Sequence, residues 1–249
     1  MATRAIACHA AGVDDLGNAH PGQAERKAAH ALFDFLVPIV KGFSTECSLE
    51  VTSLGVQVHG GMGFIEETGA AQYYRDSRIL TIYEGTTGIQ SNDLVGRKTQ
   101  RDGGAVALAL ADRMQETAGE LAGRLAQAAP QYRDGLALIH EQLSAAIAAY
   151  RAAVQFVLDH AREDVRAVYA GSVPYLMLAG YVVGGWHMAR AALVCEAAAR
   201  DGVADPFMQN KFATAVFYAG HILPRAGALV AAMRNGVTTT AALAMADLV

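Results

Sequence analysis

The chain has 249 residues, of which 53% are hydrophobic and 18% are charged, and its formal net charge is −4. This length can bury one large core or two smaller ones, and neither half of the chain is basic, so a nucleic-acid partner is not expected. Three widely spaced cysteines, Cys8, Cys47 and Cys195, are typical of free thiols in a reducing compartment, and no C-x-x-C pair indicates structural zinc. With no apolar run typical of a secretory signal at its start, the chain is expected to be cytoplasmic.

The first 60 residues read as helices separated by turns. We expect a short helix that ends at about Gly12 and a second helix that starts at Pro21. Apolar residues keep helical spacing through the second helix, but Pro38 should kink or divide it. A further helical pattern then runs up to Gly60-Gly61, where the backbone must turn.

The next segment contains most of the chemically informative residues. Residues 60–70 are expected to form a loop, followed by a short helix over residues 70–76. Residues 79–83 read as extended backbone that ends at Glu84. Thr86 stands where a helix N-cap is expected, and a new apolar helical face follows it.

After a polar stretch at residues 98–104, which we interpret as a linker, the pattern is helical to the end. One amphipathic helix closes near Pro130, and apolar residues between Leu136 and Val157 then recur every seven residues, as in antiparallel bundles. Further helices are expected around residues 175–200 and 205–223, with a tail at 226–234 and 240–248. The predicted fold class is all-α, in two parts that span residues 1–98 and 105–249.

One stretch of the second part is long enough to suggest a membrane span. Residues 167–189 contain no Asp, Glu, Lys or Arg. The stretch is, however, rich in glycine and lacks a strong flanking basic cluster. We therefore expect a buried helix and no membrane span.

Two features of the segment from Gln57 to Gln90 suggest binding or catalysis. The glycines at 60, 61 and 63 could expose backbone N–H groups to a phosphate, although a simple glycine turn at a helix end is the more common use of this pattern. Glu84 follows an apolar approach and precedes Gly85, a setting in which a carboxylate would be partly desolvated and suited to act as a general base. The histidines show no spacing typical of metal ligands, so no metal is expected.

Three blocks in fixed order resemble the C-terminal helical domain of acyl-CoA dehydrogenases. They are Gln57-x-x-Gly60-Gly61-Met62-Gly63-Phe64, then Tyr74-Arg75-Asp76, then Ile82-Tyr83-Glu84-Gly85-Thr86. The resemblance covers residues 1–98. The remainder looks like the extra helical domain of a longer subgroup that includes 3-methylmercaptopropionyl-CoA dehydrogenase-like enzymes.

The resemblance implies a role for each matched residue. Glu84 would be the base that removes the α-proton of an acyl-CoA thioester, with the β-hydrogen passing as hydride to FAD. Tyr83 and Gly85 would lie against the substrate. The residues that match FAD contacts are Gln57, His59, Gly60, Gly61 and Thr86, the first four of them toward a neighbouring subunit. Gly88 departs from the glutamine of many family members, which puts one such contact in doubt.

The resemblance also implies that the domains supplying most of the flavin and acyl-CoA site are not in this chain. We therefore expect an incomplete FAD site and an inactive chain when it is alone. Expected partners are acyl-CoA, an electron-transfer flavoprotein or similar acceptor, and either further copies of the chain or a chain that supplies the N-terminal domains. A non-catalytic helical scaffold derived from the family is the alternative.

Overall fold

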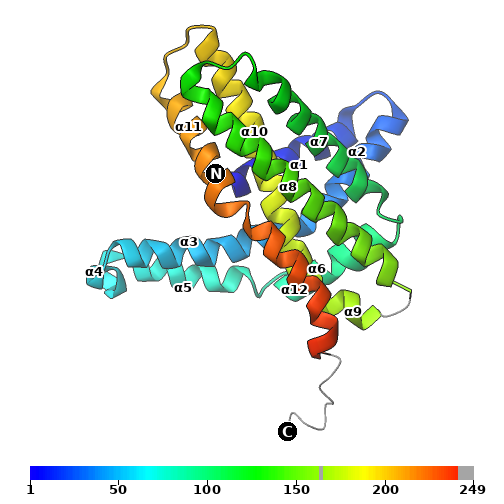
Figure 1. Cartoon of the computed structure of the whole chain (residues 1–249). Coiled ribbons are helices and arrows are strands. Elements are labelled where there is room, and N and C mark those ends of the chain that lie inside the picture. Colours follow the sequence, from blue (N-terminus) through cyan, green and yellow to red (C-terminus); the bar gives the residue numbers. More distant parts are fainter. Residues whose placement is uncertain (163–164, 241–249) are drawn as a thin grey trace.

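The structure is a computed structural model that describes residues 1–162 and 165–240. These residues form helices joined by turns, with no strand among them, so the predicted all-α class is confirmed. Figure 1 shows a helical body from which a two-helix arm projects. Apart from Thr240, the tail expected at 240–248 lies outside the described residues.

The helices follow one another along the whole chain. They are α1 (Ala2–Ala19), α2 (Gln23–Pro38), α3 (Ser44–Val58), α4 (Gly61–Phe64), α5 (Ala70–Leu80), α6 (Thr87–Asp93), α7 (Ala105–Leu125), α8 (Pro130–His160), α9 (Val165–Ala170), α10 (Ser172–Arg200), α11 (Pro206–Phe217) and α12 (Arg225–Thr240). Three π-helical turns, η1 (Ile39–Phe43), η3 (Leu94–Gln100) and η4 (Tyr218–Ile222), and one 3-10 turn, η2 (Glu66–Thr68), complete the order. Pro38 divides the helical stretch as expected, since α2 ends there and η1 begins at Ile39.

Helix α10 is the centre of the body. It contacts α1, α6, α7, α8, α11 and α12, and most of its residues from Tyr175 to Ala192 are buried. Its glycines allow close packing, since a Cβ placed on Gly180 would overlap the ring of Phe43. The uncharged stretch 167–189 is therefore largely core, as expected for a buried helix.

The two predicted parts share one hydrophobic core. Leu94 and Val95 of the first part belong to the same buried cluster as Leu110 and Val154 of the second. The segment expected to be a linker begins inside η3, and residues 101–104 form the turn into α7. The division into 1–98 and 105–249 remains a prediction.

Three local predictions are wrong. The first helix continues past Gly12 to Ala19, because it buries Val13 and Gly17 against α2, which outweighs the cost of one helical glycine. Residues 60–70 are not a plain loop but contain α4 and η2. Residues 79–83 are not extended, because α5 runs on to Leu80 while it pairs with α3.

Among the described residues, one helical stretch is long and apolar enough to span a membrane, and it is not the stretch 167–189. It is Pro206–Gly236, which contains α11, η4 and most of α12 and is interrupted by a turn at Leu223-Pro224. Core helices of soluble proteins meet the same criterion, so this stretch carries no argument for a membrane role.

Candidate functional site

Glu84 lies in a tight turn between α5 and α6. The backbone N–H groups of Ile82 and Tyr83 both donate to the carbonyl of Ile79, at 3.0 and 3.1 Å. Glu84 has φ of 50° and Gly85 has φ of 95°, and Glu84 is the one non-glycine residue with positive φ in the described part of the chain. A side chain held in this region costs about 1–3 kcal/mol, so the surrounding contacts must hold the turn in place.

Lys41 supplies the strongest of those contacts. Its Nζ donates to the backbone carbonyls of Leu80, Tyr83 and Gly85, at 2.7, 2.9 and 2.8 Å. The ammonium also lies 5.5 Å from the centre of the Tyr83 ring. Because Lys41 is in η1, these bonds attach the Glu84 turn to the body of the protein.

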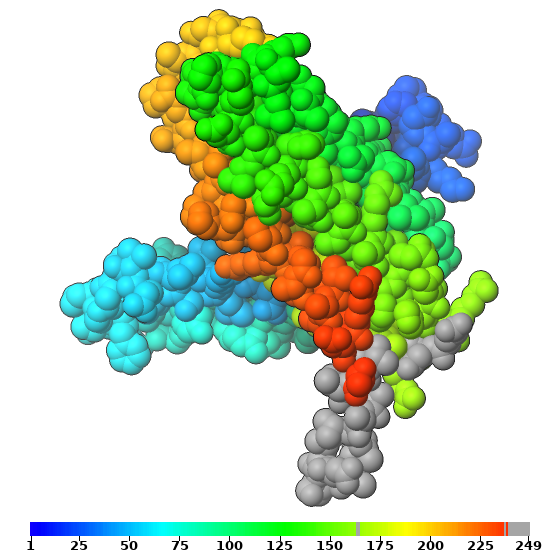
Figure 2. Space-filling model, in the orientation of Figure 1, coloured from blue at the N-terminus to red at the C-terminus, as the bar shows by residue number. Residues whose placement is uncertain are grey.

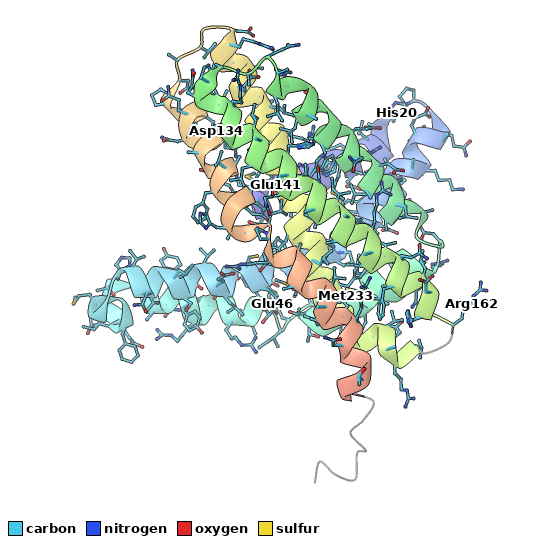
Figure 3. All side chains as sticks on the ribbon, viewed as in Figure 1. His20, Glu46, Asp134, Glu141, Arg162 and Met233 are labelled. Carbon is cyan, nitrogen blue, oxygen red and sulfur yellow. The ribbon has the colours of Figure 1, made fainter. Side chains whose placement is uncertain are left out.

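The far side of the turn is held by α6 and the start of α3. The Thr86 hydroxyl oxygen accepts a hydrogen bond from the N–H of Ile89 at 3.3 Å, which confirms the predicted N-cap of α6. The Thr87 hydroxyl donates to the Glu46 carboxylate at 2.5 Å. Glu46 is labelled in Figure 3 at the end of α3 that meets the body.

Gly85 leaves room that another group fills. A Cβ placed there would lie 2.6 Å from Nε2 of Gln90, so the Gln90 side chain rests against this glycine. With its positive φ and this contact, position 85 requires glycine. Tyr83 is 45% exposed beside it.

The carboxylate of Glu84 is exposed, which corrects the expectation of a partly desolvated group. The turn lies at the surface because neither α5 nor α6 folds back over it. Two hollows form near the arm, one lined by Cys47, Leu54 and Phe217 and the other by Val51 and His59, and Glu84 lines neither. A low-dielectric environment for this group would have to come from another polypeptide segment.

The second group of predicted residues lies at the tip of the arm. Gln57 and His59 end α3, and Gly60 and Gly61 lead into α4. All four are exposed, and a Cβ at either glycine would meet nothing within 4 Å. The Nδ1–H of His59 donates to the backbone carbonyl of Gly55 at 2.9 Å, and the side chain lines a hollow of about 270 Å³.

The structure does not bring these two groups together. The Glu84 turn lies at the root of the arm and the glycine turn at its tip, as the course of α3 and α5 in Figure 1 shows. Helix α3 has 15 residues, which corresponds to about 22 Å at 1.5 Å per residue. One flavin ring therefore cannot touch both ends of the arm.

A groove of about 560 Å³ lies between α3 and the α11–η4 segment. On its wall, burial and then the nearby Glu50 carboxylate raise the pKa of the Cys47 thiol to about 12, so this thiol is not a nucleophile. Two hydrogen bonds from Arg225 to Glu50, at 2.8 and 2.9 Å, hold the pKa of that carboxyl below its usual range. The groove thus has an apolar floor, and at its edge Arg225 neutralises the charge of Glu50.

Sequence reasoning missed Lys41, Glu46 and Gln90. Lys41 and Glu46 are 39 to 44 residues away from the groups they bind, so no local pattern pairs them. The available signal is the lone lysine in the run Phe35-Leu-Val-Pro-Ile-Val-Lys-Gly-Phe43. A charged residue inside an apolar helical stretch usually has a specific partner.

Comparisons with known proteins match most of the chain to one group of enzymes. A family model described as "Acyl-CoA dehydrogenase, C-terminal domain" matches residues 10–98, and one described as "Acetyl-CoA dehydrogenase C-terminal like" matches residues 110–244. Over 222 residues the chain is 48% identical to 3-methylmercaptopropionyl-CoA dehydrogenase from Ruegeria pomeroyi. The aligned region is 88% of this chain and 36% of that enzyme.

Two further relatives have related activities. A broad-specificity linear acyl-CoA dehydrogenase from Mycobacterium tuberculosis is 33% identical over 206 residues, which is 80% of this chain and 33% of that protein. A subunit of a caffeyl-CoA reductase-Etf complex from Acetobacterium woodii is 40% identical over 58 residues, covering 23% of this chain and 15% of that subunit. The chain spans about a third of the length of the first two relatives.

Proposed function

Because the chain belongs to the acyl-CoA dehydrogenase family and corresponds to its C-terminal part, we propose that it supplies the base of an FAD-dependent acyl-CoA dehydrogenase. The reaction is α,β-dehydrogenation of an acyl-CoA thioester. The observation that carries the proposal is the Glu84 turn, in which a non-glycine residue with φ of 50° is held by three bonds from one lysine. Strain of this kind in an exposed turn is typical of a functional position.

Each residue of the turn has a role in this reaction. The Glu84 carboxylate removes the proton from the carbon next to the thioester. Gly85 has no side chain of its own, so the substrate can approach its backbone where the Gln90 side chain now rests, and Tyr83 covers the edge of the same site. Negative charge that develops on the thioester oxygen is stabilised by the Glu84 backbone N–H.

The residues at the tip of the arm fit a contact with FAD. Gly60 and Gly61 offer exposed backbone with open space around them, and Gln57 and His59 add exposed polar side chains. Thr86, at the root, would contribute a contact beside the base. FAD, when bound, accepts the β-hydrogen as hydride. Because the root and the tip are about 22 Å apart, the tip would serve the FAD of a neighbouring subunit.

The proposed enzyme needs more polypeptide than this chain. The exposed carboxylate of Glu84 and the open arm are consistent with a site that is closed by the domains found in the other two thirds of the relatives. Those domains would be supplied in the same protein or by a partner chain, in an assembly of several copies. Electron-transfer flavoprotein or a similar acceptor would reoxidise the flavin.

Replacement of the base is the decisive experiment. A completed enzyme can be made by joining residues 1–249 to the preceding part of 3-methylmercaptopropionyl-CoA dehydrogenase. In that enzyme Glu84→Gln should lower turnover of acyl-CoA about 10²- to 10⁴-fold and leave the FAD content unchanged, because a general base contributes a factor of that size. The matched control is Glu67→Gln, which changes an exposed carboxylate on the arm and should retain full turnover.

The outcome separates this proposal from its alternative. Full turnover by Glu84→Gln would show that Glu84 is not the base. A completed wild-type enzyme that binds FAD but never dehydrogenates an acyl-CoA would favour a non-catalytic helical module. Residues 1–249 alone should show no dehydrogenation with an artificial electron acceptor.

A further inference from the structure

We propose that Lys41 is the positioning residue of the base, and that it also polarises the peptide group that carries the Glu84 N–H. The inference rests on the proposed function of Glu84. Its starting observation is that three carbonyl groups of one short turn converge on a single ammonium group.

The ammonium of Lys41 is fully used by the turn. A lysine has three N–H donors, and the carbonyls of Leu80, Tyr83 and Gly85 accept at 2.7, 2.9 and 2.8 Å. Without a cation these three carbonyl dipoles would point at one another. Leu80 is also the last residue of α5, where a helix favours positive charge. Lys41 therefore offsets both the repulsion and the unfavourable φ of Glu84.

Lys41 itself is anchored in the core. Its neighbours Ile39 and Phe43 in η1 are 0% and 1% exposed. A Cβ on Gly42 would lie 2.5 Å from the Leu176 side chain, so η1 packs directly on α10. The position of Glu84 is thereby fixed relative to the body and not only relative to the exposed arm.

The hydrogen bond from Lys41 to the Tyr83 carbonyl has a further chemical effect. The carbonyl of Tyr83 and the N–H of Glu84 belong to the same peptide group. Donation from a charged ammonium to that carbonyl increases the partial positive charge on the N–H, as in a cooperative hydrogen-bond chain. This N–H is the proposed donor to the thioester oxygen, so Lys41 strengthens the oxyanion stabilisation without touching the substrate.

Hydrogen exchange on residues 1–249 tests the contact directly. In Lys41→Met the amides of Ile82, Tyr83 and Thr87, which donate within the turn, should exchange about tenfold faster or more, because three hydrogen bonds to a charged group are lost. The control Lys27→Met changes an exposed lysine of α2 and should leave these amides unchanged. Equal exchange in Lys41→Met and the wild type would overturn the proposal.

Kinetics of the completed enzyme test the positioning role. Lys41→Met should lower kcat about 10- to 100-fold, with FAD retained and KM for acyl-CoA changed less than about threefold, because a displaced base and a weaker donor act on the reaction step. Exchange of the acyl α-hydrogen with D2O should fall in parallel. Lys41→Arg, which keeps the charge, should recover part of kcat, whereas Lys41→Gln should not.

The result is distinguishable from failure of the proposed function. A wild-type completed enzyme without activity would reject the role of Glu84, while hydrogen exchange would still decide whether Lys41 holds the turn. Unchanged kcat and α-hydrogen exchange in a folded Lys41→Met enzyme would overturn the positioning role. If Lys41→Met does not fold, the same readouts in Lys41→Gln decide the matter.

Discussion

The imidazole of His187 lies inside the body, between His9 of α1 and Trp186 of α10. The ring centres of His187 and His9 are 4.9 Å apart, and Nε2 of His187 is buried without a hydrogen-bond partner in the described structure. Burial, together with the smaller effects of the nearby His9 and Arg190, lowers the pKa of His187 to about 3. The ring is therefore neutral in the folded protein.

This neutral histidine predicts a loss of stability in mild acid. The unfolded chain takes up a proton near pH 6.5 but the folded chain only near pH 3, so between these values stability decreases as the pH falls. From pH 7 to pH 5 His187 should account for a loss of about 2 kcal/mol in the free energy of unfolding. Urea denaturation at both pH values measures it. The variant His187→Gln should lose this part of the pH dependence. The control His221→Gln, which changes an exposed histidine, should keep it. Equal pH dependence in His187→Gln and the wild type would show that His187 is not the source of the loss.

For single residues, interactions between sequence neighbours were predictable and long-range contacts were not. Thr86 was identified as an N-cap because its role depends on residues three positions away. Lys41 was missed because its acceptors are 39 to 44 residues further along the chain. The exposure of Glu84 could not be predicted either, because it depends on which segments fold over the turn.

Among the helices, α10 determines how closely the two halves of the chain approach. Gly180 lets Phe43 of η1 pack on the helix backbone, and Phe43 in turn lies against Tyr181, with ring centres 5.0 Å apart. The uncharged composition of this helix was predictable from sequence. The partner that each glycine faces was not predictable from sequence, because the side chains of both helices together determine how the two helices cross.

The close crossing predicts opposite effects of the same substitution at two helical glycines. Gly180→Ala should lower the free energy of unfolding by about 1–3 kcal/mol, because the new methyl group overlaps Phe43. Gly119→Ala in α7 should raise it by about 0.5–1 kcal/mol, since nothing lies within 4 Å of the new group and a helical glycine is removed. Urea denaturation of both variants compares them. Equal effects at the two positions would mean that the crossing is looser than described.

The incorrect prediction of extended backbone at 79–83 is also explained by the packing of helices. The hydroxyls of Thr52 on α3 and Ser77 on α5 lie 3.0 Å apart, and Ser77 is buried there. This pairing keeps α5 helical up to Leu80, although Ile79, Leu80 and Ile82 suit a strand. Tertiary packing thus overrides the local propensity.

For the molecule as a whole, the arm is the least protected part. Figure 2 shows it standing clear of the body, and α3 has no buried residue. Large apolar side chains are exposed along it, among them Val58 at 85% and Phe64 at 82%. Two helices alone bury too little surface to be stable, and exposed apolar surface of this extent indicates a contact with another polypeptide.

The exposed arm predicts a difference in hydrogen exchange between two parts of one chain. In residues 1–249 the amides of α3 and α5 should exchange at least about 100-fold faster than those of α10, because the arm opens without unfolding the core. In the completed enzyme the arm should become protected. Equal protection of α3 and α10 in the isolated chain would show that the arm needs no cover.

The separation of root and tip along the arm has a genetic consequence. If each catalytic centre combines the root of one copy with the tip of another, a copy that lacks Glu84 still carries an intact tip, and a copy with a damaged glycine turn still carries an intact base. Mixed in one assembly, the two defective copies would rebuild some complete centres. Two alleles that are each inactive alone would then complement one another.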